Sequence, residues 1–208
     1  MSSLALKSAV ADENGSSSSD DYVALGLYEA RGERRREPRV LSLLSALLER
    51  SVRKNERMVE TSRYKDRATL FHGVSAPSLT IHQYVVRIFK YSRCSPSCFV
   101  LAQVYIDRFI RCTALILTSL TVHRLLIAAV VVAAKFIDDS FFNNAYYARV
   151  GGVSTAELNK LEMKLLFGLD FRLHVTVDTF DDYCSTLRRD GVAVTGGFGD
   201  RRIGTELH

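Results

Sequence analysis

Residues that could bind a metal ion are few in this 208-residue chain. Asp138 and Asp139 are adjacent carboxylates after a long apolar segment, a pattern also found in helical enzymes that bind diphosphates through metal ions. Those enzymes need a third carboxylate three residues further on, where this chain has Phe142. Cys94 and Cys98 could supply two thiolates, but a zinc site needs four converging ligands. We therefore predict no metal ion and no other cofactor.

The remaining reactive side chains do not form a recognisable catalytic set. None of the histidines pairs with a serine or cysteine in the order of a known triad, and no glycine-rich loop for phosphate follows a strand. Cys112 and Cys184 have no second pair at a ligand spacing, so we expect them to be small buried apolar residues. We predict a non-catalytic protein with no small-molecule substrate.

Two charged residues stand where the helical periodicity predicts burial. Lys135 closes an apolar run of ten residues, Leu125–Ala134, and Glu162 lies between Leu158 and Leu165 on an apolar stripe. Burying either charge alone would cost several kcal/mol. Together they could neutralise each other and leave hydrogen-bonding capacity for a partner. The alternative is a lysine that extends to water and an exposed glutamate.

The elements that would position this pair are helices. From Thr80 onward, apolar residues recur at three- and four-residue spacings, and no stretch keeps the two-residue alternation of a strand. Capping signals mark helix starts at Thr80, Ser95, Thr121 and Ser154. The helix that ends near Ile137 is apolar on all sides and should be buried. We predict an all-α fold: five core helices around a buried central helix, with one helix before them and a short helix after them.

Composition divides the chain into four segments. We expect residues 1–37, which are polar and rich in serine, to be a disordered extension that contributes nothing to the fold. Residues 38–62 should form an amphipathic N-terminal helix, and residues 63–188 the core domain. Residues 189–208, rich in glycine and charge, should be a flexible tail.

Charge and hydropathy limit the partners and the location. Residues 31–67 carry 12 Arg or Lys against 6 Asp or Glu, which could attract nucleic acid or an acidic protein surface. No nucleic-acid-binding module accompanies this flank, so we favour a solvated helix face over nucleic-acid binding. The longest apolar run is far shorter than the roughly 20 residues that cross a bilayer, and the first 30 residues lack a signal sequence. We expect an intracellular protein of the nucleus or cytoplasm that does not bind membranes.

Several phrases of the sequence resemble the cyclin box. The phrases that match its second, third and fifth helices in order and spacing are 104–109 (VYIDRF), 132–136 (VAAKF) and 161–167 (LEMKLLF). Finer phrases resemble the plant P-type or U-type cyclins, a single-box group related to the fungal phosphate-response cyclins; they are 89–91 (FKY), 94–100 (CSPSCFV) and 143–147 (NNAYY). The resemblance covers residues 38–187.

This resemblance implies a regulatory subunit that forms a heterodimer with a cyclin-dependent protein kinase and orders the kinase αC helix, controlling cell division or nutrient-linked signalling. In the family, a lysine that ends the third helix and a glutamate of the fifth hydrogen-bond the kinase backbone; these match Lys135 and Glu162. An apolar pocket beside them receives a side chain of αC. Its lining in this chain would be Val132, Phe136, Leu166, Phe171 and Leu173.

The chain departs from the mitotic cyclins near its first core helix. Those cyclins pair the aspartate of helix two, here Asp107, with an arginine, but residues 78–81 contain none. We expect Asp107 and Tyr105 to be structural, with Arg87 as the partner of Asp107. The mitotic cyclins also carry a substrate-docking patch with a tryptophan. Tyr84 lies near that place and the chain has no tryptophan, so we do not expect substrates to be recruited there.

Two other functions remain open alternatives. Some general transcription factors share the cyclin fold and bind nucleic acid, and the basic flank at 31–67 is the sequence feature that favours such a role. Those factors normally carry two repeats, whereas this chain has room for one. A small helical enzyme is the third class, although no convergent catalytic set supports it.

Overall fold

The computed structural model describes residues 16–28, 37–61 and 68–195, and every regular element within these ranges is a helix. The all-α prediction is therefore confirmed. The helices are α2 (Ser16–Leu25), α3 (Arg39–Thr61), α4 (Ile81–Ser92), α5 (Ser97–Thr113), α6 (Val122–Ile137), α7 (Asn144–Gly151), α8 (Thr155–Gly168) and α9 (Val177–Thr195).

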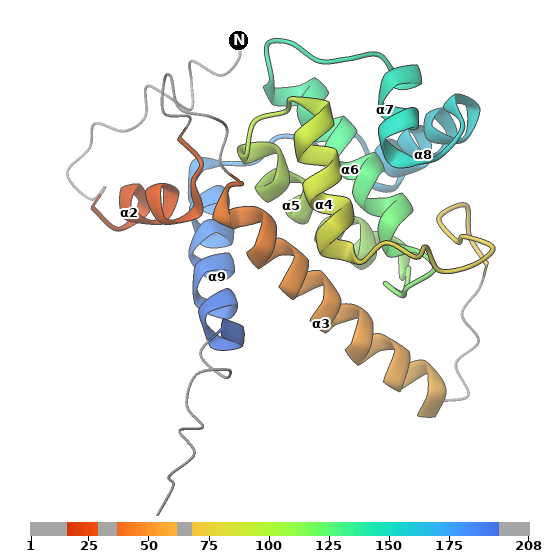
Figure 1. The fold of residues 1–208 in the computed structure, drawn as a ribbon, viewed down its shortest axis with the longest axis horizontal. Helices are drawn as coiled ribbons and strands as arrows, with labels where there is room; N and C mark the ends of the chain where they lie inside the picture. Colours follow the sequence, from red (N-terminus) through yellow and green to blue (C-terminus); the bar gives the residue numbers. More distant parts are fainter. Residues whose placement is uncertain (1–15, 29–36, 62–67, 196–208) are drawn as a thin grey trace, which may run out of the picture.

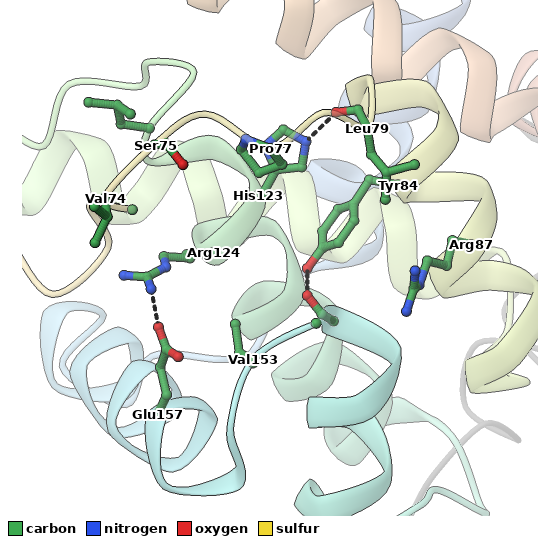
Figure 2. Close-up of a pocket in the computed structure, with 14 residues that line it drawn as sticks. Val74, Ser75, Pro77, Leu79, Tyr84, Arg87, His123, Arg124, Val153 and Glu157 are labelled. Carbon is green, nitrogen blue, oxygen red and sulfur yellow. Dashed lines mark hydrogen bonds and ion pairs between the residues drawn. The ribbon is translucent and has the colours of Figure 1, made fainter.

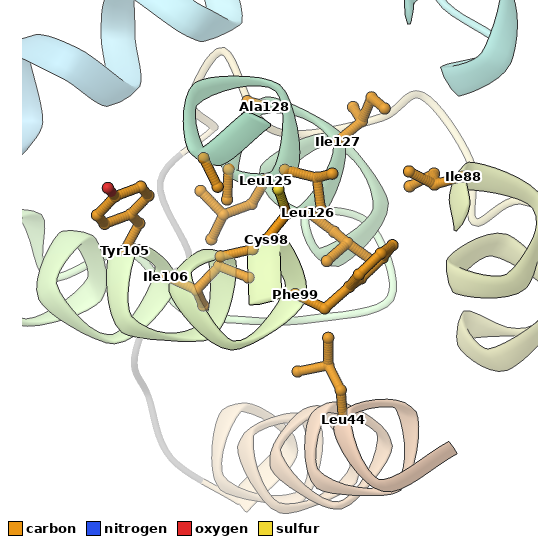
Figure 3. Packing of buried hydrophobic residues seen from close by; sticks show 14 of the residues in the cluster. Leu44, Ile88, Cys98, Phe99, Tyr105, Ile106, Leu125, Leu126, Ile127 and Ala128 are labelled. Atoms are coloured by element: carbon orange, nitrogen blue, oxygen red, sulfur yellow. The ribbon is translucent and has the colours of Figure 1, made fainter. Parts of the chain in front are cut away.

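Helix α6 is the centre of a bundle formed by α4–α8, as its all-round apolar sequence predicts (Figure 1). Twelve of its sixteen residues are buried. Its side chains Leu125 and Leu126 face Phe99 of α5, while Leu44 of α3 closes the same core from outside the bundle (Figure 3). The N-terminal half of α3 covers α4 and α5, and α9 packs against α3.

Side-chain caps begin α4, α7 and α8, whereas α5 and α6 begin without one, although Ser95 and Thr121 were expected to cap them. Thr80 forms the full capping box with Gln83 at the start of α4, and Ser154 accepts a hydrogen bond from the Glu157 amide at the start of α8. Thr121 does not cap α6: its hydroxyl accepts the Thr118 amide and donates to the Ile116 carbonyl, so it organises the preceding turn. The threonine therefore predicts where α6 begins, but it does not form the capping hydrogen bond expected of it.

The expectation that residues 1–37 contribute nothing to the fold is wrong for α2. Leu25 is fully buried, and the Asp21 carboxylate accepts the Ser185 hydroxyl at 2.5 Å and pairs with Arg188 at 2.6 Å. Tyr22 donates a hydrogen bond to Asp181. These contacts bind α2 to α9 across more than 150 residues of sequence, so local composition could not reveal them. The remainder of 1–37, residues 1–15 and 29–36, lies outside the described residues.

The flexible tail was expected from residue 189, which is too early. Helix α9 continues to Thr195, so the last helix is longer than predicted, and residues 196–208 lie outside the described part of the chain. The predicted N-terminal helix at 38–62 corresponds to α3. How residues 38–62 and 63–188 divide into domains stays a prediction.

Candidate functional site

The charged pair predicted from periodicity is present. The Lys135 ammonium, in the last turn of α6, donates to Glu162 Oε1 at 2.7 Å and to Oε2 at 2.9 Å. Neither side chain is sealed in the core, because 29% of the Lys135 side chain and 13% of the Glu162 side chain are exposed. The alternative of two independent solvated charges is therefore wrong. The C-terminal position of Lys135 also places its charge favourably in the α6 dipole.

A third residue, which sequence reasoning missed, orients the glutamate. Asn144 is the first residue of α7, and its side-chain amide donates to Glu162 Oε2 at 2.6 Å and to Asn159 Oδ1 at 2.7 Å. Three helices therefore converge on one carboxylate. Asn144 lies in the phrase at 143–147, which indicated the family but did not indicate a contact between Asn144 and Glu162. A side-chain amide bridging separate helices leaves no periodic trace in a sequence.

Large apolar side chains are exposed on the elements that carry this pair. Phe136 follows Lys135 directly and is 46% exposed, while Met163 follows Glu162 directly and is also 46% exposed. Phe167, one turn further along α8, is 66% exposed, and its ring meets Phe171 edge-on with centroids 5.3 Å apart. Exposed aromatic side chains on elements that also carry a partly exposed charged pair are typical of protein interfaces.

The chain after α8 is held in a conformation that presents Phe171. Asp170 and Phe171 both have left-handed backbones, with φ of 51° and 55°, which bulky residues rarely adopt. The buried Tyr105 secures the next segment, because its hydroxyl donates to the Leu173 carbonyl at 2.9 Å. Arg108 adds bonds of 3.0 Å to the carbonyls on either side of Leu173. The fold therefore maintains an unfavourable backbone geometry that leaves an aromatic ring in water.

The five residues expected to line an apolar pocket fall into two groups. Phe136 and Phe171 offer exposed surface. Val132 is only 2% exposed and belongs to the core, while Leu166 and Leu173 are half-buried and pack against it. Val132 can therefore support the surface from below but cannot itself meet a partner. Met163 and Phe167 were not predicted, because an exposed apolar residue looks in sequence like a member of a buried stripe.

Asp107 has neutral partners, and the expectation of Arg87 is wrong. The Gln103 amide donates to the Asp107 carboxylate at 2.9 Å, and Tyr183 is a second hydrogen-bond partner. Arg87 instead donates to the Arg149 and Val150 carbonyls in the last turn of α7. Burial raises the pKa of Asp107 above its usual value, and the two hydrogen bonds oppose this shift. The pKa of Tyr183 is raised to about 12, mainly because its phenol is buried and further because the Asp107 carboxylate lies beside it.

Asp138 and the cysteines have structural surroundings. The Asp138 carboxylate accepts the Ser95 amide at 3.0 Å and the Cys98 thiol at 3.2 Å, so it serves the start of α5 although it follows α6. Cys184 is buried as expected, and Cys94 and Cys98 are buried too, but the expectation of burial is wrong for Cys112, which is exposed on α5. Within the described ranges, no three His, Cys, Asp or Glu residues are arranged to hold a metal ion.

A second candidate site is a cleft of about 420 Å³ beside α4 (Figure 2). Tyr84 lines it and donates to the Gly151 carbonyl at 2.8 Å, and Arg124 pairs with Glu157 across its floor. His123 contacts the Leu79 carbonyl at 3.1 Å, and burial lowers its pKa. The resemblance places the docking patch of the mitotic cyclins near Tyr84, and the cleft here is lined by both apolar residues, such as Leu79 and Val153, and charged ones, such as Arg124 and Glu157. The prediction that it does not recruit substrates is not tested by this geometry.

Comparison with known proteins decides the family. The cyclin family model matches residues 38–173, which contain the central helix and the Lys135–Glu162 pair. The chain belongs to the cyclin family. Relatives of this cyclin include Cyclin-P3-1 of Oryza sativa subsp. japonica, 54% identical over 173 residues, 82% of this chain and 73% of the relative. Cyclin-U3-1 of Arabidopsis thaliana is 49% identical over 197 residues, 93% of this chain and 86% of the relative.

These matches confirm the resemblance to the plant P-type and U-type cyclins. Cyclin-U4-1 of Arabidopsis thaliana adds 52% identity over 153 residues, 73% of this cyclin and 76% of the relative. Family membership supports a regulatory role for this cyclin. Among the described residues, none of the helices combines the length and apolar character that a membrane span requires.

Proposed function

We propose that this cyclin is the activating subunit of a cyclin-dependent protein kinase, which it binds as a heterodimer through the surface around Lys135 and Glu162. One observation carries the proposal: a partly exposed ion pair between α6 and α8, with exposed aromatic side chains on the same two helices and in the turn after α8. An ammonium has three donors, and Lys135 uses two of them on Glu162. Glu162 keeps acceptor capacity after its bonds to Lys135 and Asn144. The pair can therefore bind a carbonyl and an amide of a partner backbone without first breaking.

The exposed rings supply the apolar part of such an interface. Phe136, Phe167 and Phe171 would lose their water shell against an apolar helix, and aromatic side chains at interface centres commonly dominate binding energy. A partner held at this surface stays in one orientation. For a protein kinase, fixing αC lets its glutamate pair with the β3 lysine, which the transfer of phosphate requires. The cyclin would act by binding that kinase conformation more tightly than the others.

The cellular setting follows from this proposal. Regulation of a cyclin-dependent kinase would connect the protein to cell division or to nutrient-linked signalling. It would operate in the nucleus or the cytoplasm, where its kinase and substrates are found.

The test is co-purification of an affinity-tagged chain from plant cells, with mass-spectrometric identification of the bound kinase. Lys135→Ala and Glu162→Ala should each weaken kinase binding about ten- to a hundredfold, because a charge-assisted hydrogen bond is worth roughly 1.5–3 kcal/mol. Both variants should stay folded, since water can reach the residue left behind.

A matched control is available between the same two helices. Glu157→Ala removes the other ion pair joining α6 to α8, that of Arg124 and Glu157, without touching the surface around Lys135. This variant should bind kinase like the wild type. Normal kinase binding by folded Lys135→Ala and Glu162→Ala would refute the assignment of these two residues, and recovery of no kinase with the wild-type chain would refute the proposed function.

A further inference from the structure

Four cations form a stripe along the C-terminal half of α3. Arg50, Arg53, Lys54 and Arg57 follow the spacing i, i+3, i+4, i+7, which places them on one helix face. All four are exposed, and together they line a hollow of about 400 Å³. This basic stripe lies on a different element from the surface around Lys135 and from the cleft beside α4.

The helix that carries the basic stripe is held on its opposite side. The buried residues of α3 end at Val52, and beyond it the helix runs past the bundle (Figure 1). Two bonds secure this part: Asn55 donates to the Leu117 carbonyl at 2.9 Å, and Glu56 accepts the Ser119 amide at 2.9 Å. The helix backbone under the stripe is thus fixed, and a ligand would have to order only the side chains.

The charges of the stripe are largely unneutralised. Within the described ranges, no acidic side chain forms a salt bridge with Arg53, Lys54 or Arg57. Like charges three and four residues apart destabilise a helix. Of the flanking acids, Glu56 is occupied by the Ser119 amide, and Glu49 and Glu60 stand at the two ends of the stripe. A repulsive array on a rigid support favours an anionic ligand.

We propose that the basic stripe binds a short acidic segment, a run of Asp and Glu, of another polypeptide. Seven residues of helix span about 10.5 Å, the length of three to four residues of extended chain. Three of the four cations are arginines, whose planar groups pair with carboxylates through two parallel bonds. Binding does not require a kinase, so the proposal is independent of the function proposed above.

Nucleic acid fits the basic stripe less well. Glu49, Glu56 and Glu60 flank the stripe, and residues 49–61 carry a net charge of only +1. A long polyanion laid along α3 would meet these glutamates, whereas a segment of a few residues can stay between them. No aromatic residue within 49–61 could stack on a base. The electrostatics therefore favour a short peptide.

Fluorescence anisotropy with the full chain tests the proposal. The probe is a fluorescein-labelled peptide with four consecutive glutamates, and the reference is the same peptide with glutamines. The glutamate peptide should bind more tightly, and its affinity should fall when salt is raised to about 0.15 M. Arg53→Gln combined with Arg57→Gln should weaken binding about two- to twentyfold, the effect expected from losing two exposed ion pairs.

A control with the same change in net charge distinguishes binding at the stripe from general electrostatic attraction. Lys160→Gln combined with Lys164→Gln removes two exposed cations from α8 and should leave binding unchanged. Equal loss in the two double variants would overturn the proposal, because net charge alone would then explain binding. Equal binding of the two peptides, or tighter binding of a DNA duplex of mixed sequence than of the glutamate peptide, would also overturn it.

Discussion

At the scale of single residues, carboxylates of this cyclin are tuned by their surroundings. Glu162 is held by a cation and an amide, Asp138 by the start of α5, and Asp107 by hydrogen bonds from the neutral Gln103 and Tyr183, with the Arg111 charge also favouring its ionised form. The first arrangement stabilises a charge near the surface. The charge of Asp107 is buried, where it loses hydration, and this loss raises the pKa of Asp107.

Asp107→Asn should therefore increase the free energy of unfolding at pH 7. A folded-state pKa above the unfolded value means that ionisation costs stability, and the cost vanishes as the pH falls towards the unfolded value of about 3.9. The advantage of the variant should shrink over that range, as measured by urea unfolding at several pH values. Asp182→Asn, which removes an exposed charge from α9, is the control. A loss of stability at pH 7 in the Asp107 variant would contradict this account.

At the scale of elements, the end of α8 is shaped by contact with α5. A Cβ on Gly168 would lie 2.2 Å from Cε2 of Phe109, a ring that is 1% exposed and packs edge-on against Phe71. The sequence suggests that this glycine ends a helix, and α8 does end there. The packing adds a stronger reason for its presence, because the two helices could not approach this closely with any side chain at the position.

Gly168→Ala should destabilise the protein by about 1–3 kcal/mol, the usual cost of overpacking a core. Thermal unfolding followed by circular dichroism measures the loss. Phe109→Leu in the same chain should recover part of it, since residues in contact are not additive. Equal midpoints for Gly168→Ala and the wild type would show that Phe109 moves aside without cost.

At the scale of the whole molecule, the chain is closed by contacts between its two ends. The Asp21 side chain is 2% exposed, yet its ion-pair partner Arg188 is 46% exposed. Burial of the carboxylate is therefore supported by the Arg188 and Ser185 bonds, while the arginine retains contact with water. The contact joins α2 to α9 on the opposite side of the molecule from α7 and α8 (Figure 1).

Asp21→Ala should lower the free energy of unfolding by about 1.5–3 kcal/mol, the value of hydrogen bonds to a charged group. Asp20→Ala, at an exposed neighbouring position, should have little effect. Chemical unfolding of the two variants compares them directly. If both behave like the wild type, the bonds of Asp21 to Ser185 and Arg188 do not contribute to stability, and α2 would be held by Tyr22 and Leu25 alone.

Much of the fold could be predicted from residues alone. The apolar run at 125–134 identified the central helix, and the capping residues located the starts of α4 and α8. Periodicity marked Lys135 and Glu162 as charges in apolar registers but left open whether they pair, and the match to the cyclin box favoured the pair. These features depend on periodicity and local hydrogen bonds, which a linear pattern contains.

Tertiary structure alone decided the rest. Helix α2 is polar and gains its stability from α9, the Glu162 carboxylate is oriented by an amide from α7, and Asp107 bonds to Gln103 and Tyr183. Apart from the Gln103 bond, these contacts join residues far apart in the chain. Polar groups accept many possible partners, so their choice is settled only when packing brings one within about 3 Å. Sequence periodicity determined which faces of this cyclin are apolar, and packing determined which polar groups meet.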